Sequence, residues 1–223
     1  GINALQKCVD ETPFVLGREE AYIGVLIDDL ILKGTEEPYR MFTSRAEYRT
    51  LLRQDNADQR LTPKAFQLGL VSKERLDRVE RKQRLSSATV EYLKKTSYDL
   101  NKANQLLEMK NDVIVSQTDK FSKLLSRPNI NRQDLYQFEA ISVFMEDQGI
   151  EDEVFEQAEI EIKYAGYIDK ERKNADKLKR LENIKIPLSF DYDSLASLSY
   201  EAKEKLNKLQ PSTIGQASRI SGI

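Results

Sequence analysis

The side chains best suited to chemistry in this sequence are arginines, gathered in the stretch from Glu37 to Thr62. They are Arg40, Arg45, Arg49, Arg53 and Arg60. A planar guanidinium donates two parallel hydrogen bonds to one phosphate or one carboxylate. A run of arginines therefore suits either the backbone of a nucleic acid or a network of internal ion pairs.

The spacing within this stretch predicts a helix. Ser44 followed by Glu47 forms a capping box, in which each side chain bonds a backbone N–H at the start of the helix. Arg45, Arg49 and Arg53 then recur at every fourth residue, which places them in one stripe on one helical face. Two interpretations stay open: the stripe contacts RNA, or it pairs with nearby acidic side chains. Those acidic side chains are Glu47, Asp55 and Asp58.

The composition excludes several kinds of catalytic site. The 223 residues contain no histidine and a single cysteine, Cys8. A Ser-His-Asp triad and a histidine metal site therefore cannot be built, and neither a disulfide nor a cysteine zinc cluster can form within the chain. The nine glycines form neither GxGxxG nor a P-loop. We expect no catalytic, cofactor or metal site in this chain.

Charge is abundant but balanced along the sequence. Lysine and arginine together number 35 and aspartate and glutamate 37, so RNA binding would have to use a local basic patch. A charged content of 32% with few glycines is typical of long solvated helices. No apolar run approaches the roughly 20 residues of a membrane span, and no signal peptide is visible. We expect no membrane association and a cytoplasmic location.

Helical periodicity and capping residues cover most of the chain. They predict an all-α fold of helical hairpins with one long helix. The predicted longer helices are Glu19–Lys33, Ser72–Lys95, Asp152–Asn183 and Ser199–Leu209. Shorter helices are predicted at Lys102–Glu108, Ser116–Ser126, Asn131–Glu139 and from Ser212 or Thr213 to Ser221.

Three local patterns carry further expectations. The predicted helix Glu19–Lys33 is apolar on nearly every side, which is typical of a helix buried in a core or an interface. Its Asp28 and Asp29 point about 100° apart, so we expect them to act as a cap or to pair with arginines, the arginine stripe being the candidate, rather than to act as an acid–base pair. Thr62 before Pro63 predicts the start of a short helix.

The predicted helix Ser72–Lys95 carries many basic side chains. They are Lys73, Arg75, Arg78, Arg81, Lys82 and Arg84. Glu74, Asp77 and Glu80 lie between them, an alternation that favours a solvated helix face. A nucleic-acid surface is the alternative interpretation.

Several ordered segments near both ends of the chain resemble one known family. They are YIGVLIDDL at Tyr22–Leu30, EPYRMFTSRAEYR at Glu37–Arg49, DNADQRLT at Asp55–Thr62, EQAEIEIKYAGYI at Glu156–Ile168, IPLSFDY at Ile186–Tyr192, LSYEAKEKL at Leu198–Leu206 and PSTIGQASRISGI at Pro211–Ile223. In this order they resemble the MnmG (GidA) family of flavoproteins, which modify the wobble uridine of tRNA. The middle of the chain carries little of the resemblance.

The resemblance implies the activity of a longer parent protein. Members bind FAD in an N-terminal Rossmann-type domain, use NADH and act as homodimers. With the GTPase MnmE they add a carboxymethylaminomethyl group to C5 of the wobble uridine. Their helical C-terminal region is implied to contact tRNA and MnmE. Residues 1–70 are then expected to link to an FAD domain, and residues 71–223 to form a C-terminal helical domain cut short at its end.

The expected role of this chain is therefore recognition, with the redox chemistry in the rest of the parent enzyme. The candidate tRNA-binding residues are Arg40, Arg45, Arg49, Arg53, Arg60 and Arg219. The competing interpretation is a structural scaffold for dimerisation or partner docking. Its support is the near-neutral net charge and the apolar helix Glu19–Lys33.

Overall fold

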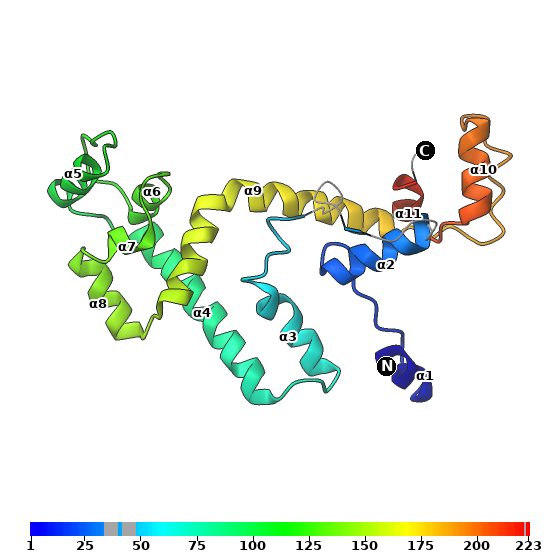
Figure 1. Ribbon diagram of the computed structural model, residues 1–223, viewed down its shortest axis with the longest axis horizontal. Helices are drawn as coiled ribbons and strands as arrows, with labels where there is room; N and C mark the ends of the chain where they lie inside the picture. Colours follow the sequence, from blue (N-terminus) through cyan, green and yellow to red (C-terminus); the bar gives the residue numbers. More distant parts are fainter. Residues whose placement is uncertain (34–39, 42–47, 221) are drawn as a thin grey trace. The chain divides into compact units, whose positions relative to one another are not determined.

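The computed structural model describes residues 1–33, 40–41, 48–220 and 222–223 (Figure 1). The described residues form helices joined by loops, with isolated β-bridges as their only β-structure. The predicted all-α fold is confirmed. The helices are α1 (Ile2–Cys8), α2 (Tyr22–Lys33), α3 (Ala57–Gln67), α4 (Lys73–Lys95), α5 (Leu100–Met109), α6 (Phe121–Leu125), α7 (Arg132–Leu135), α8 (Glu139–Gln148), α9 (Asp152–Glu182), α10 (Tyr200–Leu209) and α11 (Ile214–Ser218).

The chain forms two compact units. The first unit consists of residues 1–52 and 169–223, and the second of residues 53–168. The long helix α9 contributes its first part to the second unit and its remainder to the first.

Side-chain caps start several helices where the sequence predicts them. The Ser72 hydroxyl accepts a hydrogen bond from the Arg75 N–H at 3.3 Å, and α4 follows. Ser199 caps α10 in the same way, and Thr213 caps α11. Each hydroxyl satisfies a backbone donor that has no partner inside its own helix.

The second unit contains the larger hydrophobic core. Helices α4 to α9 all contribute to it, and α3 packs along α4 (Figure 1). Phe121, Leu125 and Phe155 are almost completely buried, and each such side chain stabilises the fold by about 1.5–3 kcal/mol. Tyr92 and Phe144 stack with their ring centres 3.9 Å apart. These contacts fix the position of α4 within the second unit.

The first unit is held by a smaller core and by close backbone packing. Tyr192, Leu206 and Ile220 form its apolar centre. Gly24 of α2 lies against the backbone of Gly17, where a Cβ atom would come within 2.3 Å of the Gly17 carbonyl oxygen. Only glycine fits α2 at this position without a backbone shift.

One face of α2 is exposed in this chain, so the core of the chain buries only part of this apolar helix, and burial in an interface stays a prediction. Val25 is fully buried, whereas Ile23, Ile27 and Ile31 are 48%, 51% and 65% exposed. These three isoleucines recur every four residues and form one stripe. We call them the isoleucine stripe.

The helix predicted across the arginine stretch is wrong for its described part. Residues 48–52 form a turn, with Tyr48 at a φ of 58°. This left-handed conformation interrupts a right-handed helix, so Arg49 and Arg53 do not share a helical face. Arg45 and the predicted capping box lie outside the described residues.

The predicted helix start at Thr62 is also wrong. Helix α3 begins earlier, after Asn56, and Pro63 lies inside it. Proline inside a helix costs a backbone hydrogen bond, and the packing of α3 along α4 offsets that cost. Helix α5 extends beyond its predicted range because Asp99 caps it, α6 is shorter than predicted, and α8 was not predicted.

Candidate nucleic-acid interface

Two of the predicted arginines are exposed in the first unit. Arg40 lies outside the helices, and Arg49 follows Tyr48 in the turn. The next residue, Thr50, donates its backbone N–H to a carboxylate oxygen of Glu171 at 3.0 Å, which holds this turn against α9. The exposed side chain of Arg49 makes no ion pair with any residue in the described part of the chain. Its guanidinium is available to an external anion.

Arg53 and Arg60 lie in the second unit and organise the loop before α3. Arg53 Nε donates to both carboxylate oxygens of Asp55 at 3.1 Å. Arg60 donates from Nε to the Asn56 side chain at 2.8 Å and from Nη2 to the Arg53 carbonyl oxygen at 3.1 Å. The pairing of Arg53 with Asp55 matches the ion-network interpretation of the arginine stretch.

Arg219 is the centre of a charged cluster in the first unit. Its Nε and Nη2 donate to the two carboxylate oxygens of Asp28 at 3.0 and 3.1 Å, and its Nη1 donates to Glu182. Arg18 bonds Asp28 and Asp29 at 2.9 Å each. This cluster joins α2 to the end of α9 and to the segment after α11.

The described arginine partners of Asp28 lie outside the arginine stripe. We predicted pairing with the arginine stripe, whereas within the described residues Arg18 and Arg219 are the arginines bonded to Asp28. Arg219 is 191 positions away from Asp28 along the chain, so no local pattern indicates this pair.

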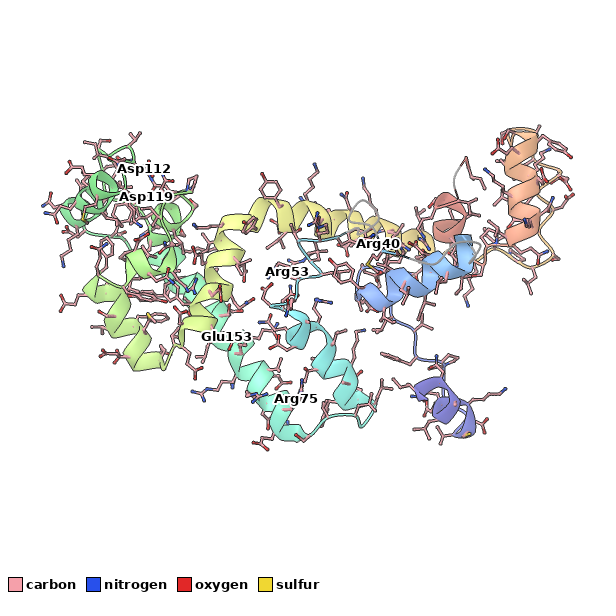
Figure 2. All side chains as sticks on the ribbon, viewed as in Figure 1. Arg40, Arg53, Arg75, Asp112, Asp119 and Glu153 are labelled. Atoms are coloured by element: carbon pink, nitrogen blue, oxygen red, sulfur yellow. The ribbon has the colours of Figure 1, made fainter. Side chains whose placement is uncertain are left out.

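Helix α4 presents a second group of cations in the second unit. Arg75, Arg78 and Arg81 are exposed and line a pocket of about 590 Å³ between α4 and the α8–α9 connection. Figure 2 shows Arg75 near the start of α4 and Glu153 near the start of α9. The sequence favoured a solvated face because acids and bases alternate. In the structure three arginines nevertheless line one pocket. Their spacing of three residues could have indicated this, because residues three apart are neighbours on a helix surface.

Lys82 lines this pocket and joins α3 to α9. Its ammonium bonds Asp58 at 3.3 Å and also bonds Glu153. Partial burial acts to lower the pKa of Lys82, but the hydrogen bonds and charges of Glu153 and Asp58 outweigh it and raise the pKa above its ordinary value. Lys82 therefore remains a cation that pairs with both carboxylates.

The most strongly perturbed ionisable groups belong to another network in the second unit. Asp152, the first residue of α9, accepts two hydrogen bonds from Arg132 at 2.9 and 3.0 Å and one from Tyr136 at 2.6 Å. The bonds from Arg132 and then Tyr136 lower the pKa of Asp152 to about 2. Burial first, and then the bond to Asp152, raise the pKa of Tyr136. This network ties α7 to the start of α9, which is a structural role.

Within the described ranges, no group of histidine, cysteine or acidic side chains is arranged to hold a metal ion. Cys8 is exposed on α1. None of the helices in the described part of the chain combines the length and the apolar content that crossing a bilayer requires. The exposed arginines in the described part of the chain can bind anions.

Comparison with known proteins identifies the fold. A family model for the C-terminal helical domain of the tRNA modifying enzyme MnmG/GidA matches residues 73–172, and a model for the C-terminal helical bundle of that enzyme matches residues 174–223. The first match includes the middle of the chain, where the motifs alone carried little resemblance.

Individual relatives match from end to end. The tRNA uridine 5-carboxymethylaminomethyl modification enzyme MnmG of Christiangramia forsetii is 55% identical over 223 residues, covering 100% of this chain and 36% of the relative. The MnmG of Flavobacterium psychrophilum is 57% identical with the same coverage. The solved structure of Aquifex aeolicus GidA in its form II crystal superposes with a TM-score of 0.74 at 40% identity, covering 100% of this chain and 34% of that one.

The chain thus spans about a third of the length of the curated relatives it matches. The matched region is helical in the family models, as it is here. The chain belongs to the MnmG/GidA family of tRNA modifying enzymes and comprises its C-terminal helical domains.

Proposed function

We propose that this chain is the recognition module of a tRNA-modifying flavoprotein and that it binds tRNA. The observation that carries the proposal is the match over the whole chain to enzymes named for modification of tRNA uridine. The exposed arginines of both units support it, because forked guanidiniums suit phosphate oxygens. In this proposal the module holds tRNA while the rest of the parent performs the reaction.

The parent reaction in this proposal adds a carboxymethylaminomethyl group to C5 of the wobble uridine, together with an MnmE-type GTPase. The parent is a cytoplasmic homodimer that binds FAD and NADH. The residues of this chain do not fit either dinucleotide, because its sequence lacks GxGxxG. In this proposal FAD and NADH bind to other parts of the parent. The division into a linker of residues 1–70 and a helical domain of residues 71–223 belongs to the same proposal.

The candidate arginines divide into two roles within this proposal. Arg40 and Arg49 are exposed, which supports direct contact with phosphate. Arg53, Arg60 and Arg219 bond protein acceptors, which supports a role in holding the surrounding backbone in place. The full candidate set for tRNA binding is Arg40, Arg45, Arg49, Arg53, Arg60 and Arg219.

The test is a titration of the 223-residue chain with unmodified tRNA at two salt concentrations. Each phosphate contact steepens the fall of log K with log[salt] by about 0.7–0.9, so binding should weaken sharply at the higher salt. Arg49→Ala should weaken binding and reduce the magnitude of that slope by about 0.7–0.9, the value for one lost phosphate contact. Arg180→Ala removes an exposed arginine of α9 and is the charge-matched control. Absence of binding at low salt would refute the proposal.

A structural scaffold is the second candidate function, and the isoleucine stripe favours it. An exposed row of three isoleucines on one helix is typical of a surface that another protein surface covers. In this alternative the stripe meets a second copy of the chain. Self-association without tRNA binding would support the scaffold, whereas salt-sensitive tRNA binding by a monomer would support recognition.

A further inference from the structure

The pocket beside α4 in the second unit has the composition of an anion site. Its basic wall consists of Arg75, Arg78 and Arg81, which come from successive turns of one helix. No ion pair joins these three side chains to the residues that the structure describes, although Lys73 and Asp77 of the same helix do pair, at 2.8 Å. Three guanidiniums therefore reach one pocket with their donors available.

The cations of the pocket outnumber its carboxylates, because Lys82 and the three arginines face Asp58, Glu151 and Glu153. Asp58 and Glu153 both bond Lys82, which leaves Glu151 as the remaining carboxylate of the lining. A neighbouring pocket is lined by Gln54, Asp55, Asp58, Lys82 and Glu153. Its described lining contains no arginine, so an anion is favoured in the pocket that Arg75, Arg78 and Arg81 line.

The loop opposite α4 leaves room for a guanidinium. Gly149, the C-cap of α8, has a φ of 60° and lies close to Arg81, whose Nη2 is 3.9 Å from the place a Cβ would occupy. Residues 75, 78 and 81 are spaced about 4.5 Å apart along the helix axis, by the rise of 1.5 Å per residue. Long arginine side chains at this spacing can reach neighbouring phosphates of one strand.

The lining also indicates which part of an RNA would be bound. The remaining side chains are the aliphatic residues Val79, Leu85 and Val154, and none of the described lining residues is aromatic. A pocket that recognises bases uses aromatic side chains for stacking. This pocket offers charge and hydrogen-bond donors without a stacking platform, which suits the sugar–phosphate backbone.

We propose that Arg75, Arg78 and Arg81 form a binding site for the phosphodiester backbone of RNA, independent of base sequence. The site rests on the proposed tRNA-binding function and adds a second contact region, in the second unit, to the exposed Arg40 and Arg49 of the first. Lys82 pairs with the Asp58 and Glu153 carboxylates of the same lining.

The experiment compares variants of the 223-residue chain in titrations with unmodified tRNA and with an RNA duplex of unrelated sequence. The double variant Arg75→Ala/Arg78→Ala should lose about tenfold or more in affinity for both RNAs, and its salt slope should fall by about 1.4–1.8 for two lost contacts. Arg84→Ala/Lys94→Ala removes the same charge from α4 outside the pocket and should bind within about twofold of the wild type.

A conservative variant separates the forked geometry from the charge. Arg75→Lys/Arg78→Lys keeps both charges but loses the paired donors, so its affinity should fall between those of the wild type and the alanine variant. All variants should keep the circular dichroism and thermal transition of the wild type, because the substituted side chains are exposed and make no ion pairs within the described part of the chain.

The outcomes distinguish this site from the proposed function. If the wild type binds tRNA and the pocket variants bind equally well with an unchanged salt slope, the pocket assignment is wrong while the tRNA-binding function stands. If only tRNA binding and not duplex binding depends on the pocket, independence from sequence is wrong. If the wild type binds neither RNA at low salt, both proposals fail.

Discussion

Asp152 shows how a single carboxylate links the fold of this chain to pH. Its hydrogen bonds from Arg132 and Tyr136 lower its pKa to about 2 in the folded state. The unfolded chain binds that proton at the ordinary aspartate pKa, which is higher. Asp152 therefore stabilises the fold above the unfolded pKa, and this contribution disappears as the pH falls toward 2.

The substitution Asp152→Asn tests this linkage. The variant should be less stable than the wild type near neutral pH, and the difference should shrink as the pH is lowered from about 4 toward about 2. Urea unfolding followed by circular dichroism at several pH values measures it. Asp147→Asn, at an exposed position near the end of α8, is the control and should show no such convergence. A difference that stays constant over this pH range would contradict the assignment.

A substitution of Arg219 would affect stability as well as any contact with tRNA. All three guanidinium nitrogens of Arg219 donate hydrogen bonds to carboxylates within the protein, Nε and Nη2 to Asp28 and Nη1 to Glu182. Removing one partner of a buried pair leaves the other charge uncompensated. Any loss of tRNA binding in an Arg219 variant therefore has to be compared with its loss of stability before a direct contact is inferred.

The helices carry glycines whose surroundings differ, and this difference predicts opposite effects of the same substitution. Gly166 lies inside α9, and apart from its chain neighbours and the backbone of its own helix no described atom lies within 4 Å of the position its Cβ would take. Gly166→Ala should stabilise the chain by about 0.5–1 kcal/mol, because alanine restricts the unfolded backbone and favours the helix.

Gly24→Ala is the matched opposite case in α2. The added Cβ would lie 2.3 Å from the Gly17 carbonyl oxygen, so the backbone must move. We expect a destabilisation of about 1–3 kcal/mol, as for overpacked sites. Thermal unfolding of both variants measures the two effects. A stable Gly24→Ala variant, or a destabilised Gly166→Ala variant, would show that the packing around that glycine is assigned incorrectly.

At the scale of the whole molecule, the isoleucine stripe and the net charge of −2 bear on association. A nearly neutral protein with an exposed apolar stripe has little charge repulsion to oppose self-association. We expect the chain to self-associate at high concentration through α2.

The substitution Ile27→Lys places a charge in the centre of this stripe. Sedimentation or light scattering should show a shift toward monomer, whereas Val113→Lys, at an exposed apolar position in the second unit, should leave association unchanged. Equal behaviour of the two variants would exclude the isoleucine stripe as the contact surface. Salt-sensitive tRNA binding that survives Ile27→Lys would separate recognition from the scaffold interpretation.

Local patterns predicted those features of this chain that depend on neighbouring residues. Periodicity and capping serines predicted α4, α9 and α10, because helix hydrogen bonds and caps join residues three or four positions apart. The lack of histidine and of glycine motifs likewise follows from the sequence alone. Pro63 misled the prediction because proline is common at a helix start, whereas tertiary packing of α3 on α4 accommodates it inside a helix.

Only the tertiary structure decided how the charged side chains are used. Arg219 meets Asp28 across 191 positions, Lys82 meets both Asp58 and Glu153, and Arg75 and Arg78 keep their donors available in a pocket. All of these residues look alike in the sequence, as charges spaced along helices. Ion pairing depends on distances of a few ångströms between residues that packing brings together, and helical periodicity says nothing about such distances.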